Sequence, residues 1–293
     1  MTASGLAPTS RKDSANGEFQ MTERDFRAVA AAIYEDAGIS LTAEKQPLVY
    51  SRLAKRLRAL ELSSFDQYVA LIESPDGAEE RRNMLAALTT NVTRFFREPH
   101  HFELLRDVVL PPLLREAERG GRVRLWSAGC SNGQEPYSIA LTLLEACPRA
   151  ASLDVKVLAS DIDPVVVAHA RAGVYDDGQA ESVPGALRAK YFAVSSESGV
   201  RRWTASAELK SLIAFRELNL NGVWPMKGPF DAIFCRNVVI YFDEPTQQKL
   251  WSRYEQLLSP EGWLFVGHSE RVSGPALAKF TSEGVTSYRR KAR

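Results

Sequence analysis

The sequence predicts an α/β fold, in which a small all-helical domain precedes an open, doubly wound sheet of mainly parallel strands. Two observations lead to this expectation. From Arg122 onward, strand-like apolar runs alternate with segments of helical apolar spacing, as βαβ units around a parallel sheet require. Before that point, residues 22–90 show only helical spacing. We therefore expect a helical domain at 21–92, a connecting motif with a helix at 93–120, and an α/β domain at 121–293.

The composition is ordinary for a globular protein of a reducing compartment. The 293 residues are 45% hydrophobic and 25% charged, and the net charge is +1, which argues against a generic polyanion binder. No apolar run approaches the length of a membrane span. Residues 1–20 are polar, lack the apolar core of a signal peptide, and are expected to be a disordered tail. The three cysteines show neither metal-ligand spacing nor a disulfide pattern, so we expect a cytoplasmic protein with free thiols.

Four helices are expected in the N-terminal domain. Thr22 can cap the first, which ends at Gly38, and the others are expected at roughly 42–60, 64–73 and 78–89. The second of these has an apolar face and a basic face. The basic face consists of Lys45, Arg52, Lys55, Arg56 and Arg58. It is either a solvated surface or a docking surface for an acidic partner, which could be a protein or a nucleic acid.

The connecting motif, TTNVTRFFREPHHF, interrupts the helical pattern at 89–102. We expect at least one of its two adjacent phenylalanine rings to lie in the core. Pro99 can begin a helix, which Pro111-Pro112 is expected to kink or break. Gly120-Gly121 then marks a turn into the α/β domain.

Five strands and three helices are expected to build the α/β domain. The strands are predicted at 123–127, 155–160, 212–218, 231–235 and 262–267, and the helices at 135–146, 164–171 and 245–258. The last strand is expected to pair with 285–290. A long excursion at 174–210 separates the second and third strands and contains two β-like runs. It predicts a small β insert, because structureless loops of that length are uncommon.

Ligand-type residues follow four of these strands at one edge of the sheet, where doubly wound folds bind their ligands. They are Gly129, Gly133 and Glu135 after the first strand, Asp161 after the second, Asn219-Leu220 after the third, and Cys235-Arg236-Asn237 after the fourth. Asp161 could accept hydrogen bonds from two ribose hydroxyls, whereas Asp163 is interpreted as the cap of the following helix. For Gly129 and Gly133 the alternative interpretation is a tight turn between strand and helix that binds no ligand.

The loop after the first strand favours a ligand that carries a positive charge. Its glycines do not match GxGxxG, and Glu135 stands where a pyrophosphate would approach the helix end. A carboxylate there would repel a pyrophosphate, but it tolerates an ammonium or sulfonium group. This favours S-adenosyl-L-methionine over a nicotinamide dinucleotide.

Five motifs together are similar to the chemotaxis receptor glutamate O-methyltransferases, the CheR family. They are TTNVTRFFREPHHF, VRLWSAGCSNGQEPYSIALTL, VLASDID, GPFDAIFCRNVVIYFD and SPEGWLFVGHSE. The resemblance extends over roughly residues 22–290 in the family's order. It implies an N-terminal helical domain and a Rossmann-like methyltransferase domain with a small β subdomain. It also implies methyl transfer from S-adenosyl-L-methionine to receptor glutamates, with S-adenosyl-L-homocysteine as the product, for sensory adaptation.

The resemblance implies roles for matching positions. Asn91, Thr93 and Arg97 resemble cofactor and active-site contacts, Glu135 and Asp161 resemble the cofactor-binding acids, and Arg97 with Tyr241 resembles the pair that orients the acceptor carboxylate. The positions that resemble residues lining the adenine and methionine moieties are Asn219, Leu220, Cys235, Arg236 and Asn237. One departure is Gln134, where many relatives have an acid or another polar residue.

The implied chemistry needs neither a general base nor a metal. A sulfonium methyl group is already activated, and a glutamate carboxyl with a pKa of about 4.3 is ionised at pH 7. The sequence agrees with this, because the four histidines form no recognisable constellation with acids. They are His100, His101, His169 and His268.

The implied partners are the cytoplasmic helices of chemoreceptors, bound either through the basic face alone or also through a receptor-tethered peptide at the β insert. We expect a monomer without nucleic-acid binding or membrane insertion. One alternative is a nucleic-acid methyltransferase, but its frequent Asp/Asn-Pro-Pro-aromatic motif is replaced here by Asn237-Val238-Val239-Ile240-Tyr241. Another is a cofactor-binding scaffold without turnover, against which Arg97 and Tyr241 argue.

Overall fold

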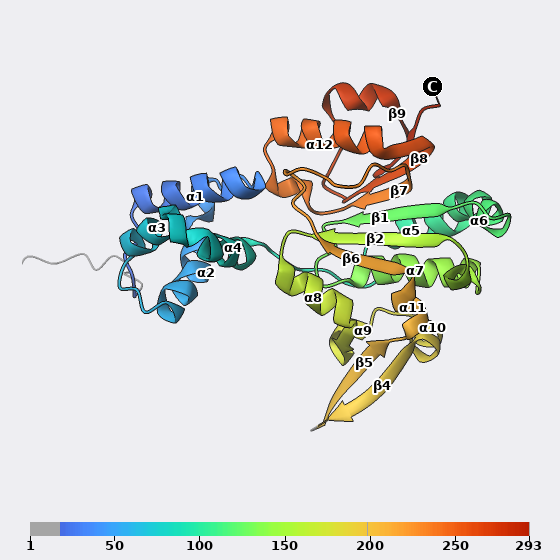
Figure 1. The fold of residues 1–293 in the computed structure, drawn as a ribbon, viewed down its shortest axis with the longest axis horizontal. Coiled ribbons are helices and arrows are strands. Elements are labelled where there is room, and N and C mark those ends of the chain that lie inside the picture. The colour runs from blue at the N-terminus through green and yellow to red at the C-terminus, as the bar shows by residue number, and fades with distance from the viewer. Residues whose placement is uncertain (1–17, 198, 293) are drawn as a thin grey trace, which may run out of the picture. The chain divides into compact units, whose positions relative to one another are not determined.

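The computed structural model describes residues 18–197 and 199–292, which fall into two compact units (Figure 1). The first unit takes in the residues up to Ala32 together with Thr42–Leu88. The second takes in Ile33–Leu41 and the residues from Thr89 onward. Each unit is described here by itself.

The first unit is helical. Its elements are α1 (Glu23–Ala37), a 3-10 turn (Ala43–Lys45), α2 (Gln46–Ala59), α3 (Phe65–Glu73), a second 3-10 turn (Pro75–Gly77) and α4 (Ala78–Leu88), with the end of α1 counted in the second unit. The predicted cap at Thr22 is confirmed: its hydroxyl accepts the Asp25 N–H at 3.2 Å, and the Asp25 carboxylate accepts the Thr22 N–H at 2.9 Å. This reciprocal pair satisfies two backbone donors that a helix start otherwise leaves free.

The predicted N-terminal tail extends too far by a few residues. Residues 1–17 lie outside the described residues, but Phe19 is packed. Its N–H donates to the Tyr50 hydroxyl at 3.1 Å, and its ring meets Phe65 edge-on with centroids 6.4 Å apart. These contacts pack Phe19 against the helices of the first unit before α1 begins.

A buried polar group links three helices of the first unit. Arg56 donates two hydrogen bonds to the Glu80 carboxylate, at 2.9 and 2.6 Å, and the Tyr68 hydroxyl donates a third at 2.8 Å. Glu80 is buried, so these donors compensate its lost hydration. Arg56 therefore has a structural role within this unit.

The rest of the predicted basic face is also partly occupied. Arg52 donates to the last carbonyl of α4 at 2.8 Å, and Arg58 pairs with Glu18 at 2.7 Å. Lys45 and Lys55 are exposed. The surface that remains for a partner is thus smaller than the sequence pattern indicates.

The second unit is built on a seven-stranded sheet, and the predicted α/β fold is confirmed. The strand order is β6-β2-β1-β7-β8-β10-β9. The strands are β1 (Val123–Ala128), β2 (Val155–Asp161), β6 (Ile213–Glu217), β7 (Phe230–Cys235), β8 (Leu258–Val266), β9 (Phe280–Gly284) and β10 (Ser287–Arg290). The first five in this order pair in parallel, and β10 pairs antiparallel with β8 and β9. The sequence did not predict β9, because most of this edge strand is exposed and lacks an apolar alternation.

Helices cover both faces of the sheet (Figure 1). They are α7 (Gln134–Ala146), α8 (Pro164–Ala172) and α12 (Glu244–Leu257), with 3-10 turns at Ala150–Ser152, Val239–Tyr241 and Gly274–Lys279. Successive residues of β1 point to opposite faces of the sheet. Leu125 packs in the hydrophobic cluster that includes residues of α7, and Trp126 packs in the one that includes residues of α12. None of the described helices is long and apolar enough to cross a membrane.

The connecting segment forms α5 (Pro99–Leu104), one π-helical turn (Leu105–Val109) and α6 (Leu110–Glu118). The predicted distortion at Pro111-Pro112 appears as this π turn, in which the Leu110 N–H donates to the Leu105 carbonyl. The prolines lie in the first turn of α6, where their missing N–H groups have no helical partner to lose.

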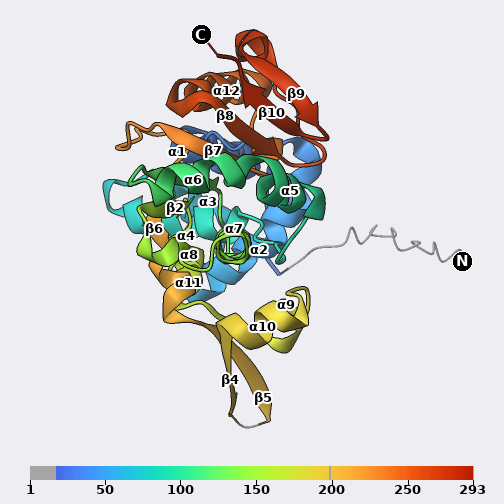
Figure 2. The same cartoon turned by 90° about the vertical axis from the view of Figure 1, so that its right-hand side faces the viewer.

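The predicted β insert is a three-stranded antiparallel sheet with short helices. Its order is β3-β5-β4. The elements are β3 (Val174–Asp176), α9 (Asp177–Ala180), α10 (Gly185–Tyr191), β4 (Phe192–Glu197), β5 (Val200–Ala205) and α11 (Ala207–Ser211). Figure 2 shows the β4–β5 hairpin projecting beyond α9 and α10. Since β5 lies between the other two strands, β4 is an edge strand with an unpaired side.

Candidate active site

The loop after β1 is held against the neighbouring strand ends. The Gly129 N–H donates to the Ser160 carbonyl at 2.8 Å. Gly129 has a φ of +82°, and a Cβ at this position would lie 2.3 Å from a methyl carbon of Val238, which follows β7. A glycine is therefore required here both by its conformation and by the close approach of two loops.

Asp161, at the end of β2, is fixed by backbone donors. Its Oδ2 accepts the Ser131 N–H at 2.8 Å, and its Oδ1 accepts the Asp163 N–H at 3.1 Å. Burial raises the pKa of this carboxyl despite these contacts. A carboxylate oxygen can accept more than one hydrogen bond, so both oxygens retain capacity for ligand hydroxyls. The predicted cap is also confirmed, since the Asp163 carboxylate accepts the Val165 N–H at 2.8 Å.

The linker residue Asn91 reaches the same edge of the sheet. Its side-chain amide donates to the Asp163 carboxylate at 3.3 Å, and its side-chain oxygen accepts from the Ser131 hydroxyl at 3.5 Å. The side-chain amide of Asn132 donates to the backbone carbonyl of Asn91 at 3.4 Å. Thr93, two residues further, is half-buried in the same irregular segment. The linker and the two strand ends thus form one polar cluster.

A buried ion-pair network lies at the start of α7. Arg236 is 2% exposed and places one guanidinium nitrogen 3.1 Å from Glu135 and another 3.2 Å from Glu98. It also donates to the Arg97 carbonyl, and Glu135 accepts the Ser127 hydroxyl at 2.7 Å. Burial raises the pKa of Glu135 although Arg236 opposes this. The sequence indicated Glu135 and Arg236 but not Glu98, since a partner as distant along the chain as Arg236 leaves no local pattern.

Burial alone would raise the pKa of Glu98 as well. The charge of Arg236 and its hydrogen bond outweigh this effect and hold the pKa of Glu98 below its usual value. Glu98 is therefore an ionised carboxylate at neutral pH.

Glu270, which follows β8, organises the loop after β7. Its carboxylate accepts the N–H groups of Asn237 at 2.8 Å and of Val238 and Val239 at 2.9 Å, together with that of Gly267. These donors hold Asn237 at a φ of +60°, which is unusual for a residue with a side chain. The sequence reasoning missed Glu270. The available signal was an acid placed three residues beyond Gly267 at the same edge of the sheet.

Three predicted residues are less open to a ligand than their positions indicate. Cys235 is buried, and its sulfur accepts the Tyr254 hydroxyl at 3.2 Å, which agrees with its interpretation as a small core residue. The Asn219 amide donates to the Asp36 carbonyl within the same unit. Leu220 is buried. Their backbone groups and apolar surfaces, more than their polar ends, can line a ligand.

Arg97 and Tyr241 lie in the two segments that flank the ion-pair network of Arg236, namely the linker and the loop after β7. Arg97 is half-buried and donates to the Val92 carbonyl at 3.1 Å, while its own carbonyl accepts from Arg236. Tyr241 is half-buried five residues after Arg236, and its backbone carbonyl accepts the Ser40 N–H at 2.8 Å.

The expectation that the histidines form no constellation with acids is wrong. His100 and His101 each bring a ring nitrogen close to the Glu98 carboxylate, with all three ligand atoms within 4.8 Å of one another. His268 lies on the other side of the same carboxylate, with its Nδ1 3.3 Å from Glu98 Oε1. The fourth histidine, His169, lies apart on α8. Glu98, His100 and His101 are neighbours along the chain, and the fold adds only His268 from the loop after β8.

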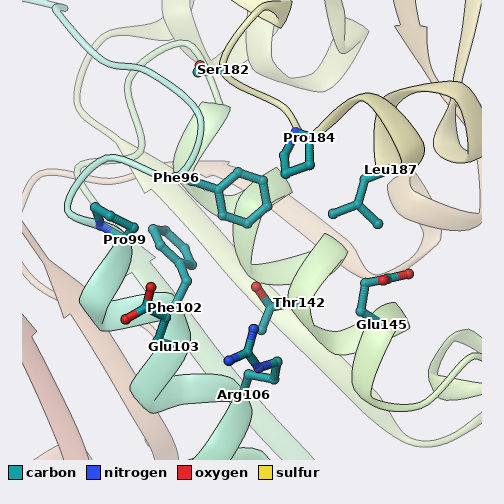
Figure 3. A pocket seen from close by; sticks show the side chains of 10 residues that line it. All are labelled: Phe96, Pro99, Phe102, Glu103, Arg106, Thr142, Glu145, Ser182, Pro184 and Leu187. Carbon is teal, nitrogen blue, oxygen red and sulfur yellow. The ribbon is translucent and has the colours of Figure 1, made fainter.

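A separate cavity of about 330 Å³ lies beside the linker. Its walls come from α5, α7 and residues 182–187 of the insert, and Phe96 and Phe102 point into it (Figure 3). Phe95 is buried in the core, as predicted for at least one of the two rings. None of the site residues predicted from the sequence is among the residues that line this cavity.

Comparisons with known proteins point to one family. The model described as "CheR methyltransferase, SAM binding domain" matches residues 91–288, and that described as "CheR methyltransferase, all-alpha domain" matches residues 24–89. The probable chemotaxis protein methyltransferase of Rhizobium etli is 57% identical over 88% of this chain and 96% of its own. Chemotaxis protein methyltransferase 2 of Pseudomonas aeruginosa is 46% identical over 87% and 89%, and the chemotaxis protein methyltransferase of Escherichia coli is 42% identical over 92% and 93%.

Proposed function

The chain belongs to the CheR methyltransferase family, and from this membership we propose that it methylates glutamate side chains of chemoreceptors. The methyl donor is S-adenosyl-L-methionine, for which the matched family model is named. The observation that carries the proposal is the polar cluster at the carboxyl edge of the sheet. Asn91, Asp161, Glu135 and Arg236 come from the linker and three strand ends, and the hydrogen bonds around them join the loops into one site.

The residues of this edge fit the cofactor. Asp161 offers two fixed oxygen acceptors, as the two hydroxyls of a ribose require. Glu135 and Glu98 share the single guanidinium of Arg236, which leaves net negative charge for a positive ligand group. Asn219 and Leu220 would flank the adenine. Cys235, Arg236, Asn237 and Gly129 would line the methionine portion, and Asn91 and Thr93 would close the site from the linker. When bound, S-adenosyl-L-methionine supplies a methyl group on a positively charged sulfur, and its transfer to a carboxylate gives an ester without moving a proton.

The protein must therefore position the acceptor and exclude water. We assign the positioning to Arg97 and Tyr241. A guanidinium can hold a carboxylate through two parallel hydrogen bonds, and a phenol adds a third donor. Contacts that are too strong would lower the nucleophilicity of the carboxylate, so orientation is the main contribution of Arg97.

Replacing Arg97 with alanine is expected to lower the methyl-transfer rate by roughly 100-fold or more, because a misplaced reactant costs about that factor. Binding of S-adenosyl-L-homocysteine, measured by calorimetry, should change far less. Arg94→Ala in the same motif is the matched control and should retain activity. Unchanged transfer in Arg97→Ala would remove Arg97 from this role, and loss of cofactor binding together with transfer would make it a cofactor contact.

We assign receptor docking to two surfaces. The first is the exposed part of the basic face, Lys45 and Lys55, which would steer the enzyme toward segments rich in unmodified glutamates. The second is the edge strand β4, to which an extended receptor-tethered peptide could add as a further strand.

The charge reversal Lys45→Glu with Lys55→Glu is expected to lower kcat/KM on receptor-containing membranes roughly tenfold at low salt, and less at high salt. Cofactor binding should stay unchanged. The matched control is Lys249→Glu with Lys279→Glu, which alters the net charge equally at exposed positions of the second unit. Equal losses in both double variants would argue against docking through the basic face.

A further inference from the structure

The side chains around Glu98 present unpaired donor atoms to one another. His100 Nε2 and His101 Nδ1 are buried and have no hydrogen-bond partner among the described residues. His101 Nδ1 lies 3.6 Å from Glu98 Oε2, and His101 is fully buried. Buried polar atoms without partners are rare in folded proteins, so two of them beside one carboxylate point to a site for a bound species.

The contacts of His101 Nε2 favour one tautomer of the imidazole ring. Its Nε2 lies 3.2 Å from the Val285 carbonyl and 2.9 Å from the Thr286 hydroxyl oxygen. The carbonyl can only accept, and the Thr286 hydroxyl donates its own hydrogen to that carbonyl at 2.8 Å. These contacts favour the tautomer with the hydrogen on Nε2, in which Nδ1 presents a lone pair toward Glu98.

A lone pair that faces a carboxylate at this distance is repulsive unless a positive species lies between them. A hydrogen bond from the second ring nitrogen to a backbone carbonyl is also the arrangement that orients metal-binding histidines in proteins. The charges allow a cation, since two carboxylates, Glu98 and Glu135, meet the single guanidinium of Arg236.

We propose that Glu98, His100 and His101 form a binding site for a divalent transition-metal ion of the Zn²⁺ class. Two imidazole nitrogens and one carboxylate oxygen are a ligand set that such ions use, with a fourth position left for water. Bonds of about 2.0–2.1 Å place tetrahedral ligand atoms about 3.3 Å apart. The separation of 3.6 Å between His101 Nδ1 and Glu98 Oε2 is close to this value. His100 is half-buried, and its ligand nitrogen lies within 4.8 Å of the other two ligand atoms.

His268 and Arg236 connect this site to the rest of the molecule. His268 places Nδ1 3.3 Å from Glu98 Oε1 and thereby orients the carboxylate from its exposed side. Arg236 shares Glu98 with the ion and also holds Glu135 and the Arg97 carbonyl. An ion that takes Glu98 weakens this pairing, so we expect it to slow methyl transfer. This last consequence rests on the proposed function, whereas the binding does not.

The test is a titration of the metal-free full chain with Zn²⁺ by calorimetry, and with Co²⁺ by visible absorption, in the absence of cofactor and receptor. We expect one ion per chain with a micromolar or tighter Kd, and a Co²⁺ spectrum of a four-coordinate nitrogen and oxygen site. Sulfur-to-cobalt charge-transfer bands should be absent, since Cys130, Cys147 and Cys235 are all buried.

Substitutions of the proposed ligands test whether the ion binds at Glu98, His100 and His101. His100→Gln and Glu98→Gln should each weaken binding roughly tenfold or more, because loss of even an outer-sphere partner of a metal ligand costs that much. His169→Gln is the matched control, since His169 also has a buried unpaired Nδ1 but has no place in the cluster. Circular dichroism melts establish that each variant is folded. Absence of binding, or binding that the first two variants leave unchanged, would overturn the proposal and leave water or a proton between His101 and Glu98.

Discussion

Replacing Arg236 with methionine is expected to lower the free energy of unfolding of the second unit by about 3–5 kcal/mol, which is the usual cost of removing one partner of a buried ion pair. The guanidinium is buried between Glu98 and Glu135, and the substitution leaves both carboxylates without a counter-charge. Methionine retains the apolar stem of arginine but not its guanidinium end, so part of the loss comes from packing and the larger part from the unpaired carboxylates. The melting temperature should fall by roughly 6–20 °C, measured by calorimetry or circular dichroism.

The matched control is Arg149→Met, which breaks an ion pair with Glu118 whose side chains are 63% and 41% exposed. Exposed pairs contribute only about 0–1 kcal/mol, so this variant should melt within a few degrees of the parent. The triple variant with Glu98→Gln and Glu135→Gln removes the unpaired charges and should recover part of the loss. If Arg236→Met melts like Arg149→Met, the buried network does not stabilise the fold in the way described.

Replacing Asp161 with asparagine is expected to weaken binding of S-adenosyl-L-homocysteine about 100-fold, since each hydrogen bond to a charged group contributes about 1.5–3 kcal/mol. The amide also turns its NH₂ group toward the N–H of Ser131 or of Asp163, where the carboxylate had accepted both. The loop after β1 should therefore become less ordered. Calorimetric titration with the product measures the first effect, and amide hydrogen exchange across residues 129–133 measures the second.

Asp154→Asn is the control for this experiment. Asp154 precedes β2 at the opposite end of the strand, is largely exposed and pairs with Arg124 at 2.7 Å. Its substitution removes the same charge without touching the proposed site, and cofactor affinity should not change. A parent-like affinity in Asp161→Asn would mean that the ribose is held elsewhere.

Local sequence patterns predicted the elements of the fold well. The strand, small-residue turn and helix from Val123 to Ala146 depend on neighbouring residues, namely Gly129 for the turn and Pro136 for the first helical turn. The cap residues Thr22 and Asp163 were predicted for the same reason. Edge strand β9 was missed because its exposed residues carry no periodic apolar signal.

The contacts that organise the site were harder to predict, because they join distant segments. Glu98 meets Arg236 only after the linker folds against the end of β7, and Glu270 reaches the Asn237 loop from 33 residues away. In the histidine cluster only His268 comes from a distant segment, and the neighbours Glu98, His100 and His101 were a local signal that the sequence reasoning missed. For the basic face, the sequence pattern predicted more free surface than the structure has. Five cations are regularly spaced in the sequence, but Arg52, Arg56 and Arg58 make contacts within the first unit.

The central claim is that this protein esterifies glutamate carboxylates. Its most direct test is the transfer of a labelled methyl group from S-adenosyl-L-methionine to chemoreceptor-containing membranes, followed by mild alkali. We expect label in the receptor band that alkali releases as volatile methanol, because a carboxyl methyl ester hydrolyses under these conditions. Label that enters protein and resists alkali would identify a different kind of methylation and contradict the proposed function.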